Sequence, residues 1–518
     1  MTAAAIRRER LGSLADGVQT ALDDLAGRDA VNRLWARDHT LWSDDPTELA
    51  DRLGWLEVAA AMAAARERLD AVAARAVADG FTHVVVMGMG GSSLFPEVLA
   101  RTFGSTGAGL ALSVLDSTDP AAVARVVAQT PAEHTLFVAS SKSGGTVETR
   151  SHLEFFWERI GRPEQFVVVT DPGSALGDLA RERTYREIFE NRTDIGGRYS
   201  ALSYFGLVPA ALAGVDWPAI VASAEAAAPS LRSADATVNA GLRLGAILGA
   251  AVAGGRDKLT LVLDDRIASF GLWLEQLVAE STGKAGTGVI PVVGELLGSV
   301  DVYGDDRLFV SIGDVGSDSI GLDVLADEGH PVVELDLPAL TDVGAQVLLW
   351  EVATAVCGAV LGINPFDQPN VAEAKEATNA VLESGASGLP TTTLDELLAA
   401  VRPGDYLAIQ VYAEPGGPEE EQLTEVRAEL RDELRVATTL GLGPRFLHST
   451  GQLHKGGPPT GVFIQVVGDD PSDAAIPGRD FTFSQLKHAQ ADGDLLTLHR
   501  HGLRAGRVTV ADLVDRTS

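Results

Sequence analysis

The stretches HVVVMGMGGSS, residues 83–93, and TLFVASSKSGGT, residues 135–146, decide the fold class of this 518-residue chain. Each begins as an apolar, β-branched run that predicts a buried strand, and each continues into glycine and hydroxyl residues ahead of a helical pattern. Two successive units of this kind predict a parallel sheet covered by helices. Both loops would then lie at the carboxyl ends of strands.

These two loops have the features of a phosphate site. Glycines let backbone N–H groups approach an anion, hydroxyls donate hydrogen bonds, and a helix N-terminus favours negative charge. The first loop alone resembles a dinucleotide-binding turn, with Asp116 placed to bind a ribose, but Ser93 stands where that motif needs its third glycine. The second loop adds hydroxyls and Lys142, which suit the terminal oxygens of a phosphomonoester better than a nicotinamide cofactor.

The composition excludes several classes of function. A formal net charge of −31 and a pI of about 4.6 argue against nucleic acid or an anionic membrane as a partner. The single cysteine, Cys357, allows no internal disulfide and no thiolate metal site. The charged N-terminus does not resemble a signal peptide, and no stretch of about 20 uninterrupted apolar residues suggests a membrane span. We therefore expect a cytoplasmic protein.

The pattern of strands and helices predicts four parts. Strands alternate with helices twice, the second time after a helical bridge, which predicts two doubly wound parallel sheets. The last part has mixed segments, including a charged helix over 419–439 and short strands near Leu496 and Val508, which predict an α+β domain. The expected parts are an N-terminal helical segment (1–80), a first α/β domain (81–217), a second α/β domain with its helical bridge (218–385) and a small C-terminal domain (390–518).

Five motifs give the chain a resemblance to a known family, the glucose-6-phosphate isomerases. The motifs are GMGGSS (88–93), SSKSGGTVET (140–149), GGRYS (196–200), AESTGK (279–284) and NPFDQPNVAEAK (364–375). The chain also resembles the isomerase half of actinobacterial transaldolase–isomerase fusions, which have a similar tail containing FLHSTGQLHKGGP. The resemblance implies two sugar-isomerase (SIS) domains. It further implies reversible isomerisation of glucose 6-phosphate to fructose 6-phosphate by ring opening and enediolate proton transfer.

The resemblance also implies a role for individual residues. An aldose–ketose isomerase moves a proton between adjacent carbons, so it needs a base and a cation for the developing oxyanion. By resemblance Glu280 is the base, Arg198 stabilises the enediolate, and Lys375 contacts the sugar during ring opening. A carboxylate needs a raised pKa for this work, so we expect Glu280 in an enclosed setting. The expected substrate-binding residues are Gly91, Ser92, Ser141, Lys142, Ser143, Thr146 and Gln368.

The resemblance also bears on cofactors and assembly. No metal or organic cofactor is implied, and the sequence has no cluster of His and Cys ligands. Members of the family are commonly dimers, so a homodimer is an expectation, although the sequence leaves the oligomeric state open. Activity on mannose 6-phosphate as well, or a non-catalytic sugar-phosphate-binding regulator, are the alternative functions.

One family feature is missing. The family supplies a ring-opening histidine shortly after the glutamate, but residues 283–314 contain none. Either Glu295 or Tyr303 takes this role, or the C-terminal loop HSTGQLHKGG supplies His448 or His454. We favour the loop, because it gathers groups that can transfer a proton near neutral pH. The alternative is that this loop makes an inter-domain contact or a second anion site.

Overall fold

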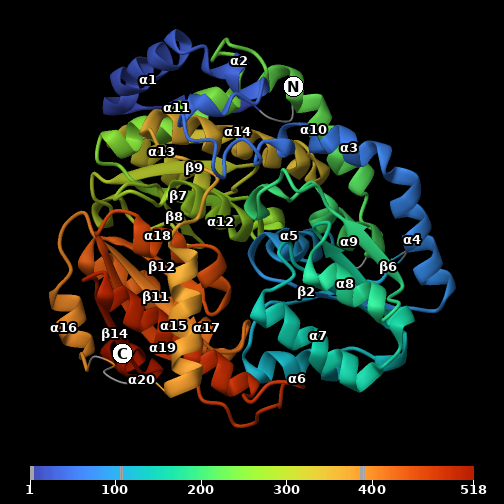
Figure 1. Ribbon diagram of the computed structural model, residues 1–518. Helices are drawn as coiled ribbons and strands as arrows, with labels where there is room; N and C mark the ends of the chain where they lie inside the picture. Colours follow the sequence, from blue (N-terminus) through green and yellow to red (C-terminus); the bar gives the residue numbers. More distant parts are fainter. Residues whose placement is uncertain (1–4, 105–106, 108, 386–388, 390, 518) are drawn as a thin grey trace.

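The computed structural model describes residues 5–104, 107, 109–385, 389 and 391–517 (Figure 1). The first α/β domain is built on a five-stranded parallel sheet in the order β3-β2-β4-β5-β6. Its strands are β2 (His83–Met87), β3 (Ala111–Leu115), β4 (Thr135–Ser140), β5 (Phe166–Thr170) and β6 (Glu187–Glu190). Because helices cover both faces, Val84, Val85 and Val86 are fully buried. The strand order reverses between β2 and β4, where ligands bind in sheets of this kind.

The two glycine-rich loops lie at this reversal point. One joins β2 to α5 and the other joins β4 to α7, as the sequence predicts. The helices of this domain are α5 (Leu94–Phe103), α6 (Pro120–Gln129), α7 (Val147–Ile160), α8 (Ala175–Glu182) and α9 (Tyr204–Leu212).

The second α/β domain has the sheet order β1-β10-β9-β7-β8. The strands β7 (Lys258–Leu263), β8 (Ile290–Val293), β9 (Arg307–Ile312) and β10 (Val332–Leu335) are parallel. Its helices are α10 (Trp217–Leu231), α11 (Ala240–Ala253), α12 (Phe270–Thr282), α13 (Asp318–Asp327) and α14 (Val343–Leu361). The helical bridge and the alternation that follows it therefore agree with the sequence pattern.

The N-terminal segment differs from the helical prediction at its start. Besides α1 (Ala15–Gly27), α2 (Ala30–Trp35), α3 (Val58–Ala64) and α4 (Arg66–Ala78), it contains β1 (Ile6–Arg10), which pairs antiparallel with β10. Arg7 binds the carboxylate of Glu334 on β10 at 2.6 Å, and Arg8 also binds it. This strand carries charges in place of apolar alternation, so its residues do not follow the pattern that predicts a strand.

The longest apolar helix is part of the core. Leu340–Leu361, which includes α14, has the length and composition of a membrane span, but 94% of its apolar window is buried inside the fold. It packs against α10, α11 and α12. A helix that is apolar on all sides and buried in this way belongs to the core of the fold.

The C-terminal domain has a four-stranded sheet in the order β12-β11-β13-β14. All its strands, β11 (Tyr406–Tyr412), β12 (Ala437–Leu442), β13 (Gly461–Val467) and β14 (Arg504–Val508), run parallel, so the domain is α/β and the α+β prediction for it is corrected. Helix α15 (Val371–Ser384) precedes this domain. The helices of the domain are α16 (Leu394–Ala399), α17 (Pro418–Leu434), α18 (Gly451–Gly456), α19 (Phe483–Arg500) and α20 (Val510–Thr517).

Two element boundaries in this domain also differ from the prediction. The charged helix α17 ends at Leu434, because Arg435 takes a left-handed conformation (φ 55°), and the chain continues into β12. Helix α19 runs through Leu496, which the sequence pattern placed near a strand.

The C-terminal domain is tied to the first domain by buried ion pairs. Arg445 forms a two-pronged contact with Asp116 at 2.8 Å, and Lys487 binds Asp119 at 3.0 Å. Both acids follow the carboxyl end of β3. Figure 1 shows the C-terminal domain, orange to red, beside the first domain. This docking brings the segment 445–456 to the edge of the sheet where the two glycine-rich loops lie.

Candidate active site

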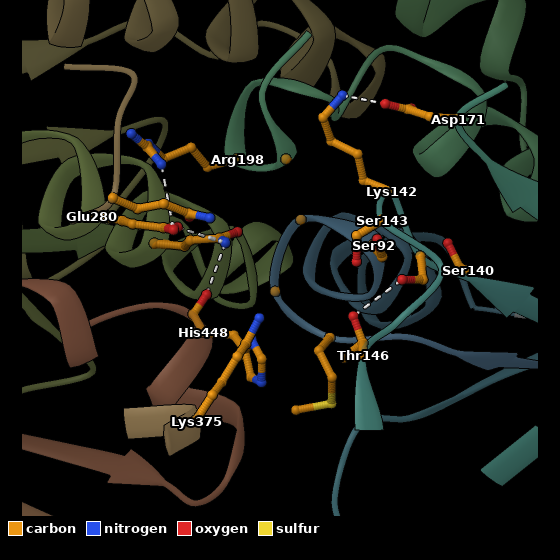
Figure 2. A pocket seen from close by; sticks show the side chains of 17 residues that line it. Ser92, Ser140, Lys142, Ser143, Thr146, Asp171, Arg198, Glu280, Lys375 and His448 are labelled. Atoms are coloured by element: carbon orange, nitrogen blue, oxygen red, sulfur yellow. Dashed lines mark hydrogen bonds and ion pairs between the residues drawn. The ribbon is translucent and has the colours of Figure 1, made fainter. Parts of the chain in front are cut away.

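A cavity of about 340 Å³ lies where the three domains meet. It is large enough for a hexose phosphate, since ligand pockets commonly measure ≈300–1,000 Å³. Its lining comes from both glycine-rich loops, the position after β5, residues 197–198, α12, the loop before α15, α15 itself and His448 of the C-terminal domain (Figure 2). The lining residues are Met89, Gly90, Gly91, Ser92, Ser140, Ser141, Lys142, Ser143, Thr146, Asp171, Gly197, Arg198, Gln276, Glu280, Gln368, Lys375 and His448. Every site residue predicted from the sequence except His454 is in this set.

One side of the cavity presents hydroxyls at a helix N-terminus. Thr146 precedes the first turn of α7, and its hydroxyl lies 3.1 Å from that of Ser141. Ser92 faces them from the other loop (Figure 2). A Cβ atom on Gly91 would lie 1.9 Å from the carbonyl oxygen of Gly197. The first glycine-rich loop therefore needs glycine at position 91 to approach the segment that contains Gly197. This side of the cavity suits an anion with several oxygens.

Lys142 is turned toward a carboxylate in this structure. Its ammonium pairs with Asp171 and donates to the carbonyl of Thr193 at 3.1 Å. Burial raises the pKa of Asp171 above its usual value, and Lys142 works against that rise. Sequence reasoning missed Asp171, although its place one residue after β5, at the carboxyl edge of the sheet, is a signal for a site residue.

The opposite side of the cavity holds a buried ion pair. The guanidinium of Arg198 lies 3.3 Å from the Glu280 carboxylate, and these side chains are only 3% and 6% exposed. Gln276, one turn earlier on α12, donates to the second carboxylate oxygen of Glu280 at 3.0 Å. Arg198 also donates to Ser281 at 2.8 Å. Glu280 is therefore enclosed, as the chemistry of a carbon-acid base requires.

His448 reaches the cavity from the C-terminal domain. Its Nε2 atom lies 3.0 Å from a carboxylate oxygen of Glu148, which also accepts a hydrogen bond from Gln490 at 2.7 Å. Burial alone would raise the pKa of Glu148, but His448 and Lys375 outweigh it, and the pKa lies below its usual value. An ionised Glu148 makes Nε2 the donor and leaves Nδ1 for other partners. Glu148 lies within SSKSGGTVET, a motif in which the sequence predicts roles for the hydroxyl residues but not for the glutamate.

Comparison with known proteins assigns the chain to a family. Residues 44–300 match the family described as phosphoglucose isomerase. A glucose-6-phosphate isomerase from Geobacter sulfurreducens is 30% identical over 391 residues, which cover 66% of this chain and 72% of that protein. This chain belongs to the glucose-6-phosphate isomerase family.

Further members of the glucose-6-phosphate isomerase family show similar likeness. The protein from Gloeothece citriformis is 30% identical over 59% of this chain and 67% of its own length. The one from Acaryochloris marina is 28% identical over 76% of this chain and 87% of its own length.

Two solved structures share the fold. A hypothetical protein from Thermus thermophilus matches 72% of this chain and 99% of its own at a TM-score of 0.61 and 24% identity. A glucose-6-phosphate isomerase from Chlamydia trachomatis matches 68% of this chain and 77% of its own at a TM-score of 0.53 and 22% identity.

The other residues considered for ring opening lie outside the cavity. His454 is enclosed by the rings of Tyr406, Phe446 and Phe463, and burial lowers its pKa to about 3. Its Nδ1 atom lies 3.2 Å from the amide of Gln410. The prediction of His454 as a site residue is therefore corrected, because a ring so buried in aromatic surroundings contributes to the core.

Glu295 and Tyr303 likewise take structural positions. Glu295 pairs with Arg307 at 3.0 Å, with both side chains 1% exposed, and the Tyr303 hydroxyl accepts from the backbone N–H of Gly298 at 2.7 Å. Neither residue lines the cavity. Of the candidates weighed from the sequence, His448 alone is a lining residue.

Proposed function

We propose that this chain interconverts D-glucose 6-phosphate and D-fructose 6-phosphate. The observation that carries the proposal is the buried Glu280–Arg198 pair, which faces the hydroxyl-lined loops across one cavity (Figure 2). A carboxylate and a guanidinium at one end and an anion site at the other match a sugar that carries its phosphate far from the reacting carbons.

The phosphate is held by the hydroxyl side of the cavity. Ser92, Ser141 and Thr146 donate to its oxygens, and the N-terminus of α7 adds the favourable end of the helix dipole. Lys142 exchanges its contact with Asp171 for the phosphate. Together these contacts place carbons 1 and 2 of the sugar toward Glu280.

Ring opening is assigned to His448 and Lys375. Glu148 fixes the imidazole with Nε2 as donor, so Nδ1 exchanges a proton with the sugar. The proton on the anomeric hydroxyl leaves, the bond between C1 and the ring oxygen breaks, and the ring oxygen receives a proton. The open-chain aldehyde is the product of this step.

Isomerisation of the open chain is assigned to Glu280 and Arg198. Glu280 removes the proton from C2, the released electron pair forms the C1–C2 double bond, and the aldehyde oxygen becomes an enediolate oxygen that Arg198 stabilises. The same carboxyl group returns the proton to C1, the proton of the C2 hydroxyl passes to the enediolate oxygen on C1, and the C2–oxygen double bond of the ketose forms. The contact of Arg198 with Glu280 supports this assignment, because it holds a cation beside the proposed base.

We also propose three features that family resemblance alone supports. These are a cytoplasmic location, a homodimeric assembly, and kinship with the isomerase half of transaldolase–isomerase fusions. His448 reaches the cavity from the same chain, so the proposed ring-opening group does not depend on a partner subunit.

A coupled assay that follows fructose 6-phosphate tests the proposal. We expect turnover without added metal or organic cofactor, and the same assay with mannose 6-phosphate measures the breadth of substrate use. Tight binding of glucose 6-phosphate with no turnover would contradict the proposal and favour a sugar-phosphate-binding regulator.

A further inference from the structure

A buried lysine outside the proposed reaction lies beside the site. Lys284 follows Glu280 by four residues, just beyond the end of α12, and is 5% exposed. Its ammonium donates to the carbonyl oxygen of Asp367 at 2.8 Å and to the Asp367 carboxylate at 2.6 Å. Lys284 does not line the cavity, and the loop it holds immediately precedes Gln368, which does.

Arg198 binds the same point of this loop. Its terminal nitrogen donates to the carbonyl oxygen of Asp367 at 2.8 Å and to that of Pro365 at 2.8 Å. One carbonyl therefore accepts from both cations. Because Arg198 also contacts Glu280, the position of the Asp367 carbonyl fixes the guanidinium relative to the carboxylate.

Hydrogen bonds from Gln452 also join the end of α12 to the loop 365–370. The amide of Gln452, from α18, donates to the carbonyl of Gly283 at 3.1 Å and to the side chain of Asn370 at 2.8 Å, and it accepts from the Asn370 backbone N–H at 2.9 Å. Gln452 is 1% exposed. The end of the Glu280 helix and the loop 365–370 are thus joined by Lys284 and by the C-terminal domain.

We propose that Lys284 is a positioning residue for the isomerisation, whose ammonium holds Asp367 and thereby keeps Arg198 and Gln368 in register with Glu280. This inference rests on the proposed function. Without the ammonium, the partly buried Asp367 carboxylate, 28% exposed, loses its ion-pair partner, and the Asp367 carbonyl that Arg198 binds is held less firmly. Misplacement by about 1 Å in such a group can cost on the order of 10²-fold in rate.

The charge of Lys284 gives this role a pH signature. Burial and the neighbouring Arg198 lower its pKa to about 8, while Asp367 and Glu280 work against that fall. Above pH 8 the amine becomes neutral, its bond to the Asp367 carboxylate loses the charge-assisted part, and the loop is held less firmly. Activity should then fall on the alkaline side.

Three variants test the inference by kcat and KM measured from pH 6.5 to 9.5. Lys284→Met removes the ammonium, and Lys284→Arg keeps a charge that does not titrate in this range. Lys258→Met is the matched control, because Lys258 is also a buried, ion-paired lysine, 2% exposed, but sits at the amino end of β7, away from the cavity.

At pH 7 we expect Lys284→Met to lower kcat about 10- to 100-fold with KM changed less than about threefold. We expect Lys284→Arg to stay within about fivefold of wild type and to keep its kcat at pH 9, where wild type declines. Lys258→Met should retain the wild-type pH profile. An unchanged kcat in Lys284→Met, or the same alkaline decline in Lys284→Arg as in wild type, would overturn the inference.

The outcomes separate this inference from the proposed function. If Lys284→Met fails to fold, as a thermal melt would reveal, the pH profile of Lys284→Arg decides alone. Absence of turnover in the wild-type enzyme refutes the proposed function. An active wild type whose Lys284 variants behave like it refutes only the positioning role.

Discussion

The imidazole of His448 donates to the carboxylate of Glu148, with 3.0 Å between the two atoms, and this contact joins the C-terminal domain to the first α/β domain at the wall of the cavity that His448 lines. Both residues are held from several sides: the His448 carbonyl accepts from Gln276 at 2.8 Å, and Glu148 accepts from Gln490. The C-terminal domain therefore completes the wall of the proposed active site. Its docking contacts are part of how the site is formed.

The role of His448 can be tested against its neighbour in the same segment. We expect His448→Asn to lower kcat about 10²-fold, because ring opening loses its proton-transfer group. His454→Asn is the control, since His454 lies outside the cavity. Its kcat should stay within about threefold where a thermal melt confirms folding. Equal losses in the two variants would mean that the segment acts only through its packing.

The hydroxyl side of the cavity should govern substrate affinity. Thr146→Val removes a phosphate donor but keeps the shape of the side chain, so we expect KM to rise about tenfold with little change in kcat. Thr424→Val, on the outer surface of α17, is a matched control. Steady-state kinetics on both variants measures the effect. An unchanged KM in Thr146→Val would place the phosphate elsewhere.

A buried carboxyl in the core predicts that stability decreases as pH rises. Glu351 on α14 is 0% exposed, neither of its carboxylate oxygens has a hydrogen-bond partner among the described residues, and burial raises its pKa well above the usual value. Between about pH 4.5 and its folded pKa, the folded protein keeps this proton and the unfolded chain releases it. The free energy of unfolding therefore falls as pH rises, by about 1.4 kcal/mol per pH unit.

Glu351→Gln removes this effect because an amide does not ionise. We expect the variant to melt at a higher temperature than wild type at pH 8, with a smaller difference at pH 5. The exposed residue Glu182 supplies the control, and Glu182→Gln should change neither melt. A difference between Glu351→Gln and wild type that does not grow with pH would argue against a protonated Glu351.

The sequence was most informative where chemistry and local pattern coincide. Ser92 and Thr146, which the sequence predicts to bind substrate, both line the cavity, because each lies in a polar loop that follows an apolar strand, and such loops meet at one edge of a parallel sheet. Glu280 and Arg198 were found through motifs shared with a family. Their contact, and their burial, required the fold.

The misses have physical reasons. His448 and His454 lie six residues apart in one polar segment, and only the docking of that segment makes one a lining residue and the other part of the core. Asp171 reaches the cavity through strand order, and Glu148 meets His448 through domain docking, and the local pattern encodes neither. Strand β1 is held by ion pairs with Glu334 in place of apolar alternation.

Deuterium transfer from solvent tests the role of Glu280 most directly. Fructose 6-phosphate is incubated with enzyme in D₂O, and NMR follows deuterium at C2 of the glucose 6-phosphate formed. Glu275→Gln is the control, because Glu275 lies on the same helix but does not line the cavity. Wild type and this control should incorporate deuterium at similar rates, and Glu280→Gln should do so at least about 10³-fold more slowly with KM nearly unchanged. Comparable incorporation by Glu280→Gln would contradict the assignment of Glu280 as the proton-transfer base.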